Sequence, residues 1–455
     1  MAASGDCNDA TATVHPGRTE ACNAVDDDCD GAPDETFACV RGSAVSCTTS
    51  CGSTGTGFCT SACGLPAGSS CNPPAETCNG RDDDCDGLAD EQLFTAGPAR
   101  VDSYPSDFAR PETARAGDYL YSFWTAAGSI HGWRLSPDGA PFSATTSQVP
   151  LGGTANYDVD GAPTALGLAY VDGTGSTGPV VVQRLSTVTL APSWTRTLPV
   201  SAYQVQIAVG NTYVFVYTRE AAGRIYRRVL STATGADVTA AVEVGQTYRP
   251  MELADDDSSR QYLVFGDTTF QQLRMVLLSG TGTSPVVSTR TADFTENIWD
   301  VAIAADWSVS GTPPAVAAVA LRPTSTSGLR MHYVSYANGS TRAIGTIESA
   351  TTPNDSGGPI RSRLDLEYAD GTYLLGAVRT TTYPLPTTGT PRVYQLNRAS
   401  STSSTLLVRA MDTGLSAAVH ESVSVARLPD TYAHPDRLFY NPPVNGIASM
   451  AIGCY

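Results

Sequence analysis

From about residue 93 onward, the chain consists of short runs in which apolar and polar residues alternate, separated by Gly, Pro, Asp, Asn and Ser. Such alternation is typical of β-strands, and the separating residues favour turns. Residues 213–217 and 262–265 are strongly apolar runs. Each is followed by an alternating run that begins with Arg, at residues 224–226 and 274–276. We therefore predict an all-β fold for this part of the chain.

The predicted strands recur in a repeating order. Short opening strands begin successive units that are about 45 to 65 residues apart. They lie at residues 157–159, 203–205, 251–253, 299–301, 364–366 and 423–425. A further unit at residues 118–135 brings the count to seven, which predicts a seven-bladed β-propeller over residues 93–455.

Two alternatives to seven blades remain open. The units that begin near residues 299 and 364 are longer than the others, so six blades with an inserted hairpin would also fit, whereas a pair of β-sandwiches would leave the period unexplained. The last unit, residues 423–452, is one strand short, and residues 93–101 are available to complete it. Closure by both chain ends would remove the exposed edges of an open ring.

Residues 1–92 differ in composition from the rest of the chain. They hold sixteen of the 45 acidic residues but three of the 28 arginines, in a protein of 455 residues with a net charge of −17 and no lysine. Eleven of the twelve cysteines lie between Cys7 and Cys85, and the twelfth is Cys454. Because large apolar residues are scarce here, we predict a separate module with little regular secondary structure, held by disulfides and ions. The sequence has no run of basic residues of the kind that binds nucleic acid, so we expect no nucleic-acid partner.

An acidic hexapeptide occurs twice in this module. Residues 26–31, Asp-Asp-Asp-Cys-Asp-Gly, recur as residues 82–87 within a frame in which eleven positions match at an offset of 56. We assign two metal-binding repeats, 6–35 and 71–91, joined by a Cys/Gly/Ser spacer, 36–70. Alternate aspartates followed by glycine can turn their oxygens inward around a hard cation, which favours calcium over an acidic turn that binds nothing.

The ligands predicted by this spacing are carboxylates together with one backbone carbonyl in each loop. No helix pattern flanks either loop, and the acidic pair falls earlier than the twelfth position of an EF-hand, so we expect a shorter calcium loop. In the first repeat the candidates are Asp26, Asp28, Asp30, Asp34 or Glu35, and the carbonyl of Ala32. In the second repeat they are Asp82, Asp84, Asp86, Asp90 or Glu91, and the carbonyl of Leu88.

The cysteine pattern predicts an oxidised protein. Each repeat has one cysteine before its Asp loop and one inside it, so Cys22–Cys29 and Cys78–Cys85 are the first pairs to expect, and the others stay open. The module holds an odd number of cysteines, so we also expect Cys454 to bridge back to it; the alternative is a free or intermolecular thiol. Zinc is a weaker alternative because paired Cys-x2-Cys knuckles are not evident.

The first repeat resembles a known motif. It runs Asp-Cys-Asn-Asp at residues 6–9, Pro-Gly at 16–17 and Glu-x-Cys-Asn-x-x-Asp-Asp-Asp-Cys-Asp-Gly-x-x-Asp-Glu at 20–35. This pattern resembles the metal-binding motif of MopE-type surface proteins, common in secreted proteins of myxobacteria, and is more distantly similar to thrombospondin type 3 calcium repeats. The second repeat matches over residues 76–91 but lacks the opening. The resemblance implies a bacterial secreted protein and also raises copper, for which the module offers His15 and no Trp.

The sequence favours a binding function over catalysis. No membrane-length apolar run and no export signal is visible. Because the cysteine pattern indicates an oxidising location, we expect the mature form of a secreted or cell-surface protein. No catalytic residue is assigned, since His131, His332, His420 and His434 occupy no repeating position and the stretch around Ser356 resembles a trypsin-like nucleophile only superficially.

We therefore expect a non-catalytic calcium-binding protein whose propeller binds a protein, a glycan or another copy of itself, in adhesion, attachment or assembly into an oligomer or fibre. The alternative is an extracellular propeller hydrolase or lyase that acts on a polysaccharide or peptide. Acidic, Arg or His side chains that converge on one face of the propeller would favour this alternative.

Overall fold

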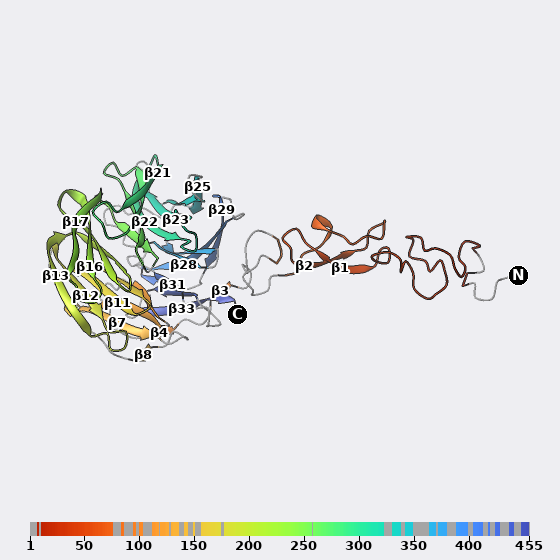
Figure 1. Cartoon of the computed structure of the whole chain (residues 1–455), viewed down its shortest axis with the longest axis horizontal. Coiled ribbons are helices and arrows are strands. Elements are labelled where there is room, and N and C mark those ends of the chain that lie inside the picture. Colours follow the sequence, from red (N-terminus) through yellow and green to blue (C-terminus); the bar gives the residue numbers. More distant parts are fainter. Residues whose placement is uncertain are drawn as a thin grey trace. The chain divides into compact units, whose positions relative to one another are not determined.

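A computed structural model gives the fold of the chain (Figure 1). It describes residues 7–8, 11–75, 83–85, 94–96, 100–102, 112–117, 119–126, 129–135, 141–143, 149–150, 156–173, 177–256, 258–322, 330–337, 342–348, 364–369, 372–379, 388–398, 404–412, 417–418, 424–427, 436–440 and 447–454. The helical elements among these residues are two short 3-10 turns, η1 (Gly68–Ser70) and η2 (Ala221–Gly223). Within the described residues, no helix has the length and apolar character needed to cross a membrane.

The chain divides into two compact units. Residues Met1–Phe94 with Cys454 form the first, which we call the arm, and residues Thr95–Gly453 with Tyr455 form the second, which we call the propeller. Among the residues described between 7 and 85, the regular strands are one hairpin, β1 (Ala44–Thr48) with β2 (Thr54–Phe58). Apart from η1, the remainder of this described region is turns and loops, so its conformation depends on cross-links and side-chain hydrogen bonds.

Six sheets of the propeller are each built from strands that follow one another in the chain. The strands of the first two sheets are β5 (Glu112–Ala116), β6 (Tyr119–Ala126), β7 (Ser129–Leu135), β8 (Pro141–Ser143) and β9 (Val149–Pro150), then β10 (Tyr157–Ala162), β11 (Ala165–Val171), β12 (Gly178–Leu185) and β13 (Pro192–Ala202). Those of the third and fourth are β14 (Gln204–Val209), β15 (Tyr213–Arg219), β16 (Arg224–Ser231) and β17 (Asp237–Gln246), then β18 (Met251–Asp255), β19 (Arg260–Gly266), β20 (Gln272–Ser279) and β21 (Val286–Asp293). Those of the fifth and sixth are β22 (Asn297–Ala305), β23 (Ala315–Arg322), β24 (Arg330–Tyr336) and β25 (Arg342–Glu348), then β26 (Asp365–Ala369), β27 (Thr372–Arg379), β28 (Thr388–Arg398), β29 (Leu406–Asp412) and β30 (Ala417–Ala418).

A further sheet, the closing sheet, combines strands from both ends of this sequence. It contains β31 (Ser424–Arg427), β32 (Asp436–Tyr440) and β33 (Ile447–Cys454) together with β3 (Phe94–Ala96) and β4 (Arg100–Asp102). Ile447 pairs with Asp102, and Ser449 pairs with Arg100. The innermost strands contact one another in the order β5, β10, β14, β18, β22, β26, β31 and back to β5, so the ring is closed.

The all-β propeller is thus confirmed, with six blades of consecutive strands and a closing sheet. The prediction that residues near 93–101 complete the last unit is also confirmed.

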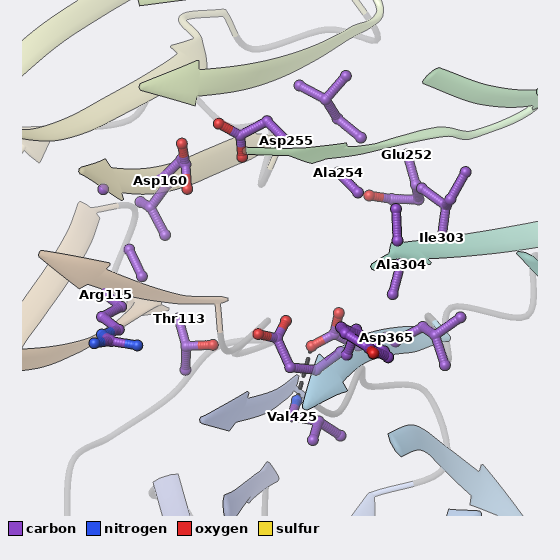
Figure 2. A pocket seen from close by; sticks show the side chains of 18 of the residues that line it. Thr113, Arg115, Asp160, Glu252, Ala254, Asp255, Ile303, Ala304, Asp365 and Val425 are labelled. Carbon is purple, nitrogen blue, oxygen red and sulfur yellow. Dashed lines mark hydrogen bonds between the residues drawn. The ribbon is translucent and has the colours of Figure 1, made fainter. Parts of the chain in front are cut away.

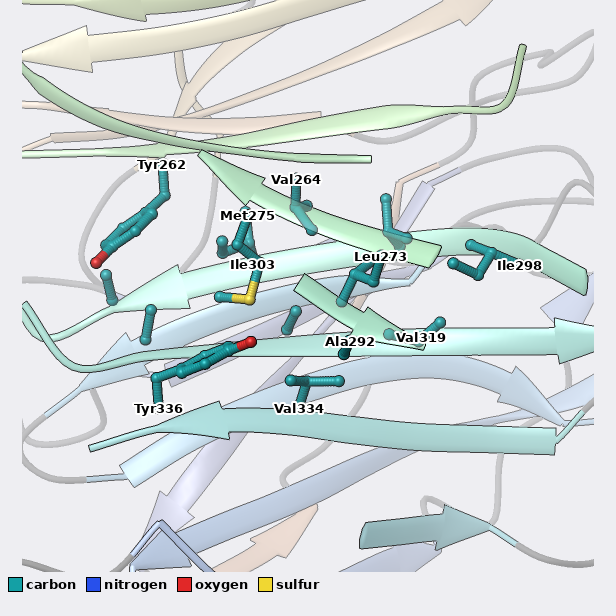
Figure 3. Packing of buried hydrophobic residues seen from close by; sticks show 14 of the residues in the cluster. Tyr262, Val264, Leu273, Met275, Ala292, Ile298, Ile303, Val319, Val334 and Tyr336 are labelled. Atoms are coloured by element: carbon teal, nitrogen blue, oxygen red, sulfur yellow. The ribbon is translucent and has the colours of Figure 1, made fainter. Parts of the chain in front are cut away.

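Apolar side chains fill the spaces between neighbouring sheets. All seven residues of β11 are buried, whereas the outer strand β13 is mostly exposed or half-buried, with few buried positions. One cluster joins the sheets β18–β21 and β22–β25 and includes Tyr262, Met275, Ile303 and Val334 (Figure 3). Fully burying an apolar side chain of this size contributes about 1.5–3 kcal/mol. The propeller therefore has a large hydrophobic core, which the described part of the arm lacks.

Polar side chains on the innermost strands bind the next blade. The bonds join Asp158 Oδ2 to Ile207 N, Asp300 Oδ2 to Leu364 N, Asp365 Oδ2 to Val425 N, and the side-chain amide of Gln204 to the backbone of Met251, at 2.7 to 3.1 Å. Ser424 and Thr113 share a hydroxyl–hydroxyl bond of 2.8 Å between the last innermost strand and the first. An innermost strand has no sheet neighbour on its channel side, so its N–H groups need such acceptors. We call these residues the inter-blade bridges.

Candidate functional site

Five disulfides connect the arm. They are Cys7–Cys29, Cys22–Cys63, Cys39–Cys59, Cys47–Cys71 and Cys51–Cys85. The predicted pairs Cys22–Cys29 and Cys78–Cys85 are therefore wrong. Backbone N–H groups of Asp27 and Ala21 donate hydrogen bonds to the carboxylates of Glu20 and Asp27, which fold the loop on itself. The sulfur of Cys29 faces Cys7 in the opening segment, and that of Cys22 faces Cys63 in the spacer. Cys78 and the side chain of Cys454 lie outside the part that the structure describes.

The two repeats cross-link equivalent cysteines to different partners. Cys29 and its equivalent Cys85 both have left-handed backbone, with φ of 60° and 64°. Cys29 bonds to Cys7, which belongs to the Asp-Cys-Asn-Asp opening of the first repeat. The second repeat lacks this opening, and Cys85 bonds to Cys51 of the spacer. The spacer therefore supplies the half-cystine that the second repeat does not contain.

Glu20 organises the first Asp loop from inside. Its side chain is buried; Oε1 accepts hydrogen bonds from Asp27 N at 2.7 Å and Asp28 N at 3.1 Å, and Oε2 accepts one from Asp34 N at 2.8 Å. Glu20 matches Glu76 in the repeated frame, but the spacing of the Asp loop does not predict it as a ligand. The repetition is the signal that could have revealed this role: an acidic residue stands at the same sequence distance before each Asp loop, which suggests the same role in both repeats.

Asp34 has a structural position, away from the loop carboxylates. Its carboxylate accepts hydrogen bonds from the backbone N–H groups of Asn23, Ala24 and Arg41 at 2.8 to 3.2 Å, and the residue is 1% exposed. Burial favours the neutral acid, but the N–H donors of Arg41, Asn23 and Ala24 outweigh it and lower the pKa of Asp34. Of the alternative ligands Asp34 and Glu35, the geometry therefore places Glu35 with the other carboxylates.

Two overlapping groups of carboxylates converge in the first repeat. Oxygens of Glu20, Asp26 and Asp28 lie within 4.8 Å of one another, and so do oxygens of Asp28, Asp30 and Glu35. Partial burial, and then the charge of Asp30, raise the pKa of Asp28. At Glu35, a hydrogen bond from the backbone N–H of the same residue lowers the pKa, but burial and the nearby carboxylates outweigh it, so the pKa is raised overall. The nearby carboxylates therefore add to the effect of burial at both residues.

The backbone of the loop is wound tightly around these side chains. Asp26 Oδ2 accepts a hydrogen bond from Gly31 N at 2.9 Å, Asp28 Oδ1 accepts one from Asp30 N at 3.1 Å, and Asp30 Oδ1 accepts one from Ala32 N at 2.9 Å. Gly31 has φ of 100°, where a side chain would be strained. The remaining lone pairs of these carboxylates are available to a cation.

The donor chemistry of this site fits a hard cation and does not fit copper. All five converging residues offer carboxylate oxygens. The described cysteines are in disulfides, and His15 is exposed, with Nδ1 at 3.2 Å from the carbonyl oxygen of Pro16 and outside both carboxylate groups. Calcium prefers six to eight oxygen ligands, whereas copper favours imidazole and sulfur.

Most of the second loop lies outside the described residues. Asp82, Asp86, Leu88, Asp90 and Glu91 are in this undescribed part. The described residues are consistent with a similar loop: Asp83 is buried like its equivalent Asp27, and Ser53 Oγ donates to the carbonyl oxygen of Asp83 at 2.7 Å. Asp84 is also described, at a partly buried position.

A second candidate site lies in the propeller, in the channel that the innermost strands enclose. This cavity has a volume of about 610 Å³ and is lined by residues of β5, β10, β14, β18, β22, β26 and β31. Figure 2 shows Asp160, Glu252, Asp255 and Asp365, from three different strands, around one opening, with Arg115 at its side. The convergence of acidic side chains expected for an enzyme is therefore present in part.

Of the histidines considered from the sequence in the propeller, the two that the structure describes, His131 and His332, lie on different sheets. His131 is buried and stacks on Trp124, with ring centroids 5.6 Å apart. His332 lies on β24, where burial lowers its pKa. Ser356, His420 and His434 lie outside the described residues.

Comparison with known proteins identifies the motif of the arm. Residues 6–35 and 71–91 match the family model Cu-binding_MopE, described as "Putative metal-binding motif". The recognised motif is therefore present in both repeats. Among curated proteins, none matches the sequence of this chain.

Solved structures are similar to most of this chain. A PL25 polysaccharide lyase, an ulvan lyase bound to -[GlcA(1-4)Rha3S]-, matches with a TM-score of 0.51 and 9% identity over 78% of this chain and 96% of the lyase chain. The WD40 domain of coronin from Toxoplasma gondii matches with a TM-score of 0.45 and 11% identity over 80% of this chain and 89% of that chain. At such identities the likeness shows the fold and no activity.

Proposed function

We propose that the protein is an extracellular, non-catalytic calcium-binding protein, in which a disulfide-linked arm holds the ions and the propeller binds a glycan or a protein. The observation that carries the calcium assignment is the pair of carboxylate groups that meet at Asp28. Five disulfides support an oxidising location, because cytosolic proteins rarely keep such bonds. The MopE-type motif supports a bacterial secreted or cell-surface protein.

The first ion would be held by Glu20, Asp26, Asp28, Asp30 and Glu35, with the carbonyl of Ala32 as a further ligand. Glu20 is the addition that the structure supports. By the repeat, the second ion would be held by Asp82, Asp84, Asp86, Asp90 or Glu91 and the carbonyl of Leu88. A bound cation would remove the repulsion that raises the pKa values of Asp28 and Glu35.

Calcium titration of the chelated protein tests this assignment. Isothermal calorimetry is expected to show about two sites, and Asp28→Asn should weaken one of them about tenfold or more, because Asp28 belongs to both carboxylate groups. Asp237→Asn, an exposed change on β17 of the propeller, is the matched control and should leave both sites intact. No heat with calcium, or one-to-one uptake of copper instead, would overturn the proposal.

The cysteine pairing supports one more covalent link. Five disulfides use ten of the twelve cysteines, and the two left are Cys78 and Cys454. Cys22, the equivalent of Cys78, is bonded outside its own repeat, to Cys63. We therefore expect a Cys78–Cys454 disulfide, which mass spectrometry of unreduced proteolytic peptides would detect as one linked pair. Two peptides that each carry a free thiol would exclude it.

The propeller is the proposed partner-binding unit. We propose that the closing sheet serves as the seventh blade, which completes the ring between β26 and β5 and makes the faces and the channel the places for recognition. Attachment or self-assembly through the arm fits a cross-linked acidic segment of this kind.

The acidic channel favours one alternative function, a glycan hydrolase, since such enzymes use pairs of carboxylates. An anionic polysaccharide would be repelled by this lining, so the substrate of a hydrolase here would be neutral or basic. A hydrolase would release new reducing ends from a glycan that a binding protein only retains.

A further inference from the structure

We propose that the central channel of the propeller binds an amino sugar whose amine is not acetylated, as a unit of a basic glycan. This inference rests on the proposed function, of which it names the ligand class. It follows from four properties of the channel: its charge, the spacing of its carboxylates, a buried amide donor, and its aromatic residues and size.

The charge of the lining selects a cation. Its acidic residues are Glu112, Asp158, Asp160, Glu252, Asp255, Asp256, Asp306, Asp365 and Glu367, and Arg115 is the basic residue among the described residues of the lining. Asp256 is paired with Arg260 outside the lining. Asp158, Asp160 and Asp365 accept hydrogen bonds from backbone N–H groups, which carry no charge.

The spacing of these carboxylates does not suit a bare metal ion. Among the described residues, the groups in which three acidic oxygens come within 4.8 Å are those of the arm, and none is in the channel. All ligands of a metal ion must lie at about 2.0–2.6 Å from it, so their oxygens must be closer together than the carboxylates of the channel are. The channel carboxylates are spread over several strands, as Figure 2 shows for β10, β18 and β26. They suit an extended ligand.

Gln206 indicates that the ligand also carries hydrogen-bond acceptors. This residue lies on β14, lines the channel and is 2% exposed, and its Nε2 has no hydrogen-bond partner among the residues that the structure describes. A buried amide donor without an acceptor costs about 1–3 kcal/mol, so a ligand that supplies an acceptor recovers that loss. A metal ion or a simple polyamine has no acceptor to offer, whereas an amino sugar combines an ammonium group with hydroxyl oxygens.

The aromatic residues and the volume agree with a sugar. Trp307 and Tyr368 lie on the lining, and both are partly exposed. Aromatic rings stack on the apolar faces of sugars and attract ammonium groups. A volume of about 610 Å³ lies within the usual 300–1,000 Å³ of small-ligand pockets.

Binding to glucosamine oligomers tests the proposal on the full-length, calcium-saturated protein. At a pH near 6, where the amine is protonated, a glucosamine hexamer is expected to bind about tenfold or more tightly than the N-acetylated hexamer, with an affinity that falls as salt rises. This comparison needs no variant. Equal affinity for both hexamers, or no binding of the glucosamine hexamer, would overturn the proposal.

Variants locate the site in the channel. The double variant Glu252→Gln/Glu367→Gln should weaken binding of the glucosamine hexamer about tenfold, while Glu243→Gln, on the outer strand β17, should not change it. Gln206→Met should weaken binding without altering its salt dependence, because it removes a neutral donor. Unchanged binding in the double variant, at an unchanged melting temperature, would exclude the channel. If the double variant does not fold, Glu252→Gln alone is measured with the same criterion.

Other ligands separate this inference from the function it rests on. Spermidine or an Arg-rich peptide that binds as tightly as the hexamer, and is insensitive to Gln206→Met, would replace the amino sugar as occupant. Binding of other glycans with no preference for glucosamine would overturn this inference and leave the proposed function standing. New reducing ends from the hexamer would confirm the site and its ligand but establish the hydrolase in place of the binding protein.

Discussion

Full-length protein treated with a reductant and a chelator together is expected to lose its arm to protease while the propeller stays intact. In the described part of the arm, the buried apolar side chains are Val14, Pro66 and four cysteines, so hydrophobic burial contributes little. Each of the five disulfides spans 20 to 41 residues and stabilises the fold by about 2–4 kcal/mol. Bound calcium adds stability through its preference for the folded state.

The propeller is the internal control of this experiment. Its described core consists of apolar clusters between sheets, which neither reagent affects. Reductant alone and chelator alone should each cause partial sensitivity of the arm, and limited proteolysis followed by mass spectrometry distinguishes the four conditions. If the arm and the propeller resist protease equally after the combined treatment, the arm does not depend on cross-links and ions.

Replacing Glu20 by alanine is expected to destabilise the first repeat and to remove its calcium site. The change leaves three buried or half-buried N–H groups without their acceptors, those of Asp27, Asp28 and Asp34. Each unsatisfied N–H group costs about 1–3 kcal/mol, so we expect a loss of several kcal/mol in the stability of this repeat. Calcium affinity of the first site should fall about a hundredfold, because a ligand and the loop conformation are lost together.

Glu35→Gln is the matched variant for the Glu20 experiment. Glu35 is exposed and belongs to one carboxylate group only, so its change should weaken calcium binding without altering protease resistance in the absence of calcium. Protease resistance and calorimetry of the two variants together separate the scaffold role from the ligand role. If Glu20→Ala keeps both the calcium affinity and the protease resistance of the wild type, Glu20 is neither a ligand nor part of the scaffold.

The architecture of the propeller was largely predictable from its sequence, because strand alternation and turn residues are local signals. Residues 157–159 and 364–366 were recognised as opening strands, and they are the innermost strands β10 and β26 or adjoin them. What the pattern could not show is the task of the polar residue in the middle of each opening. Asp158 and Asp365 bind the backbone of the next blade, a contact that depends on ring geometry and not on the strand itself.

The arm was predictable in its chemistry but not in its connections. The Asp loop indicates a hard-cation site from its local spacing alone, whatever the fold of the rest of the arm. The structure brings Asp26 and Asp30 close to Asp28. Disulfide pairing instead depends on which segments meet in space, so proximity in sequence misled the assignment of Cys22 and Cys29. Six cysteines allow fifteen pairings and the number grows steeply beyond that, and nothing in the spacing distinguishes them.

The closing sheet also determines when this protein can complete its fold. Strand β4 pairs with β33, so Asp102 must wait for Ile447, which is made near the end of synthesis. Until then the edges of β4 and of the last completed blade are unpaired, and unpaired edges of this kind recruit strands from other chains. Non-local pairing also slows folding. In a ring with this topology, the last sheet can therefore close only in one late step, after the C-terminal strands have been made.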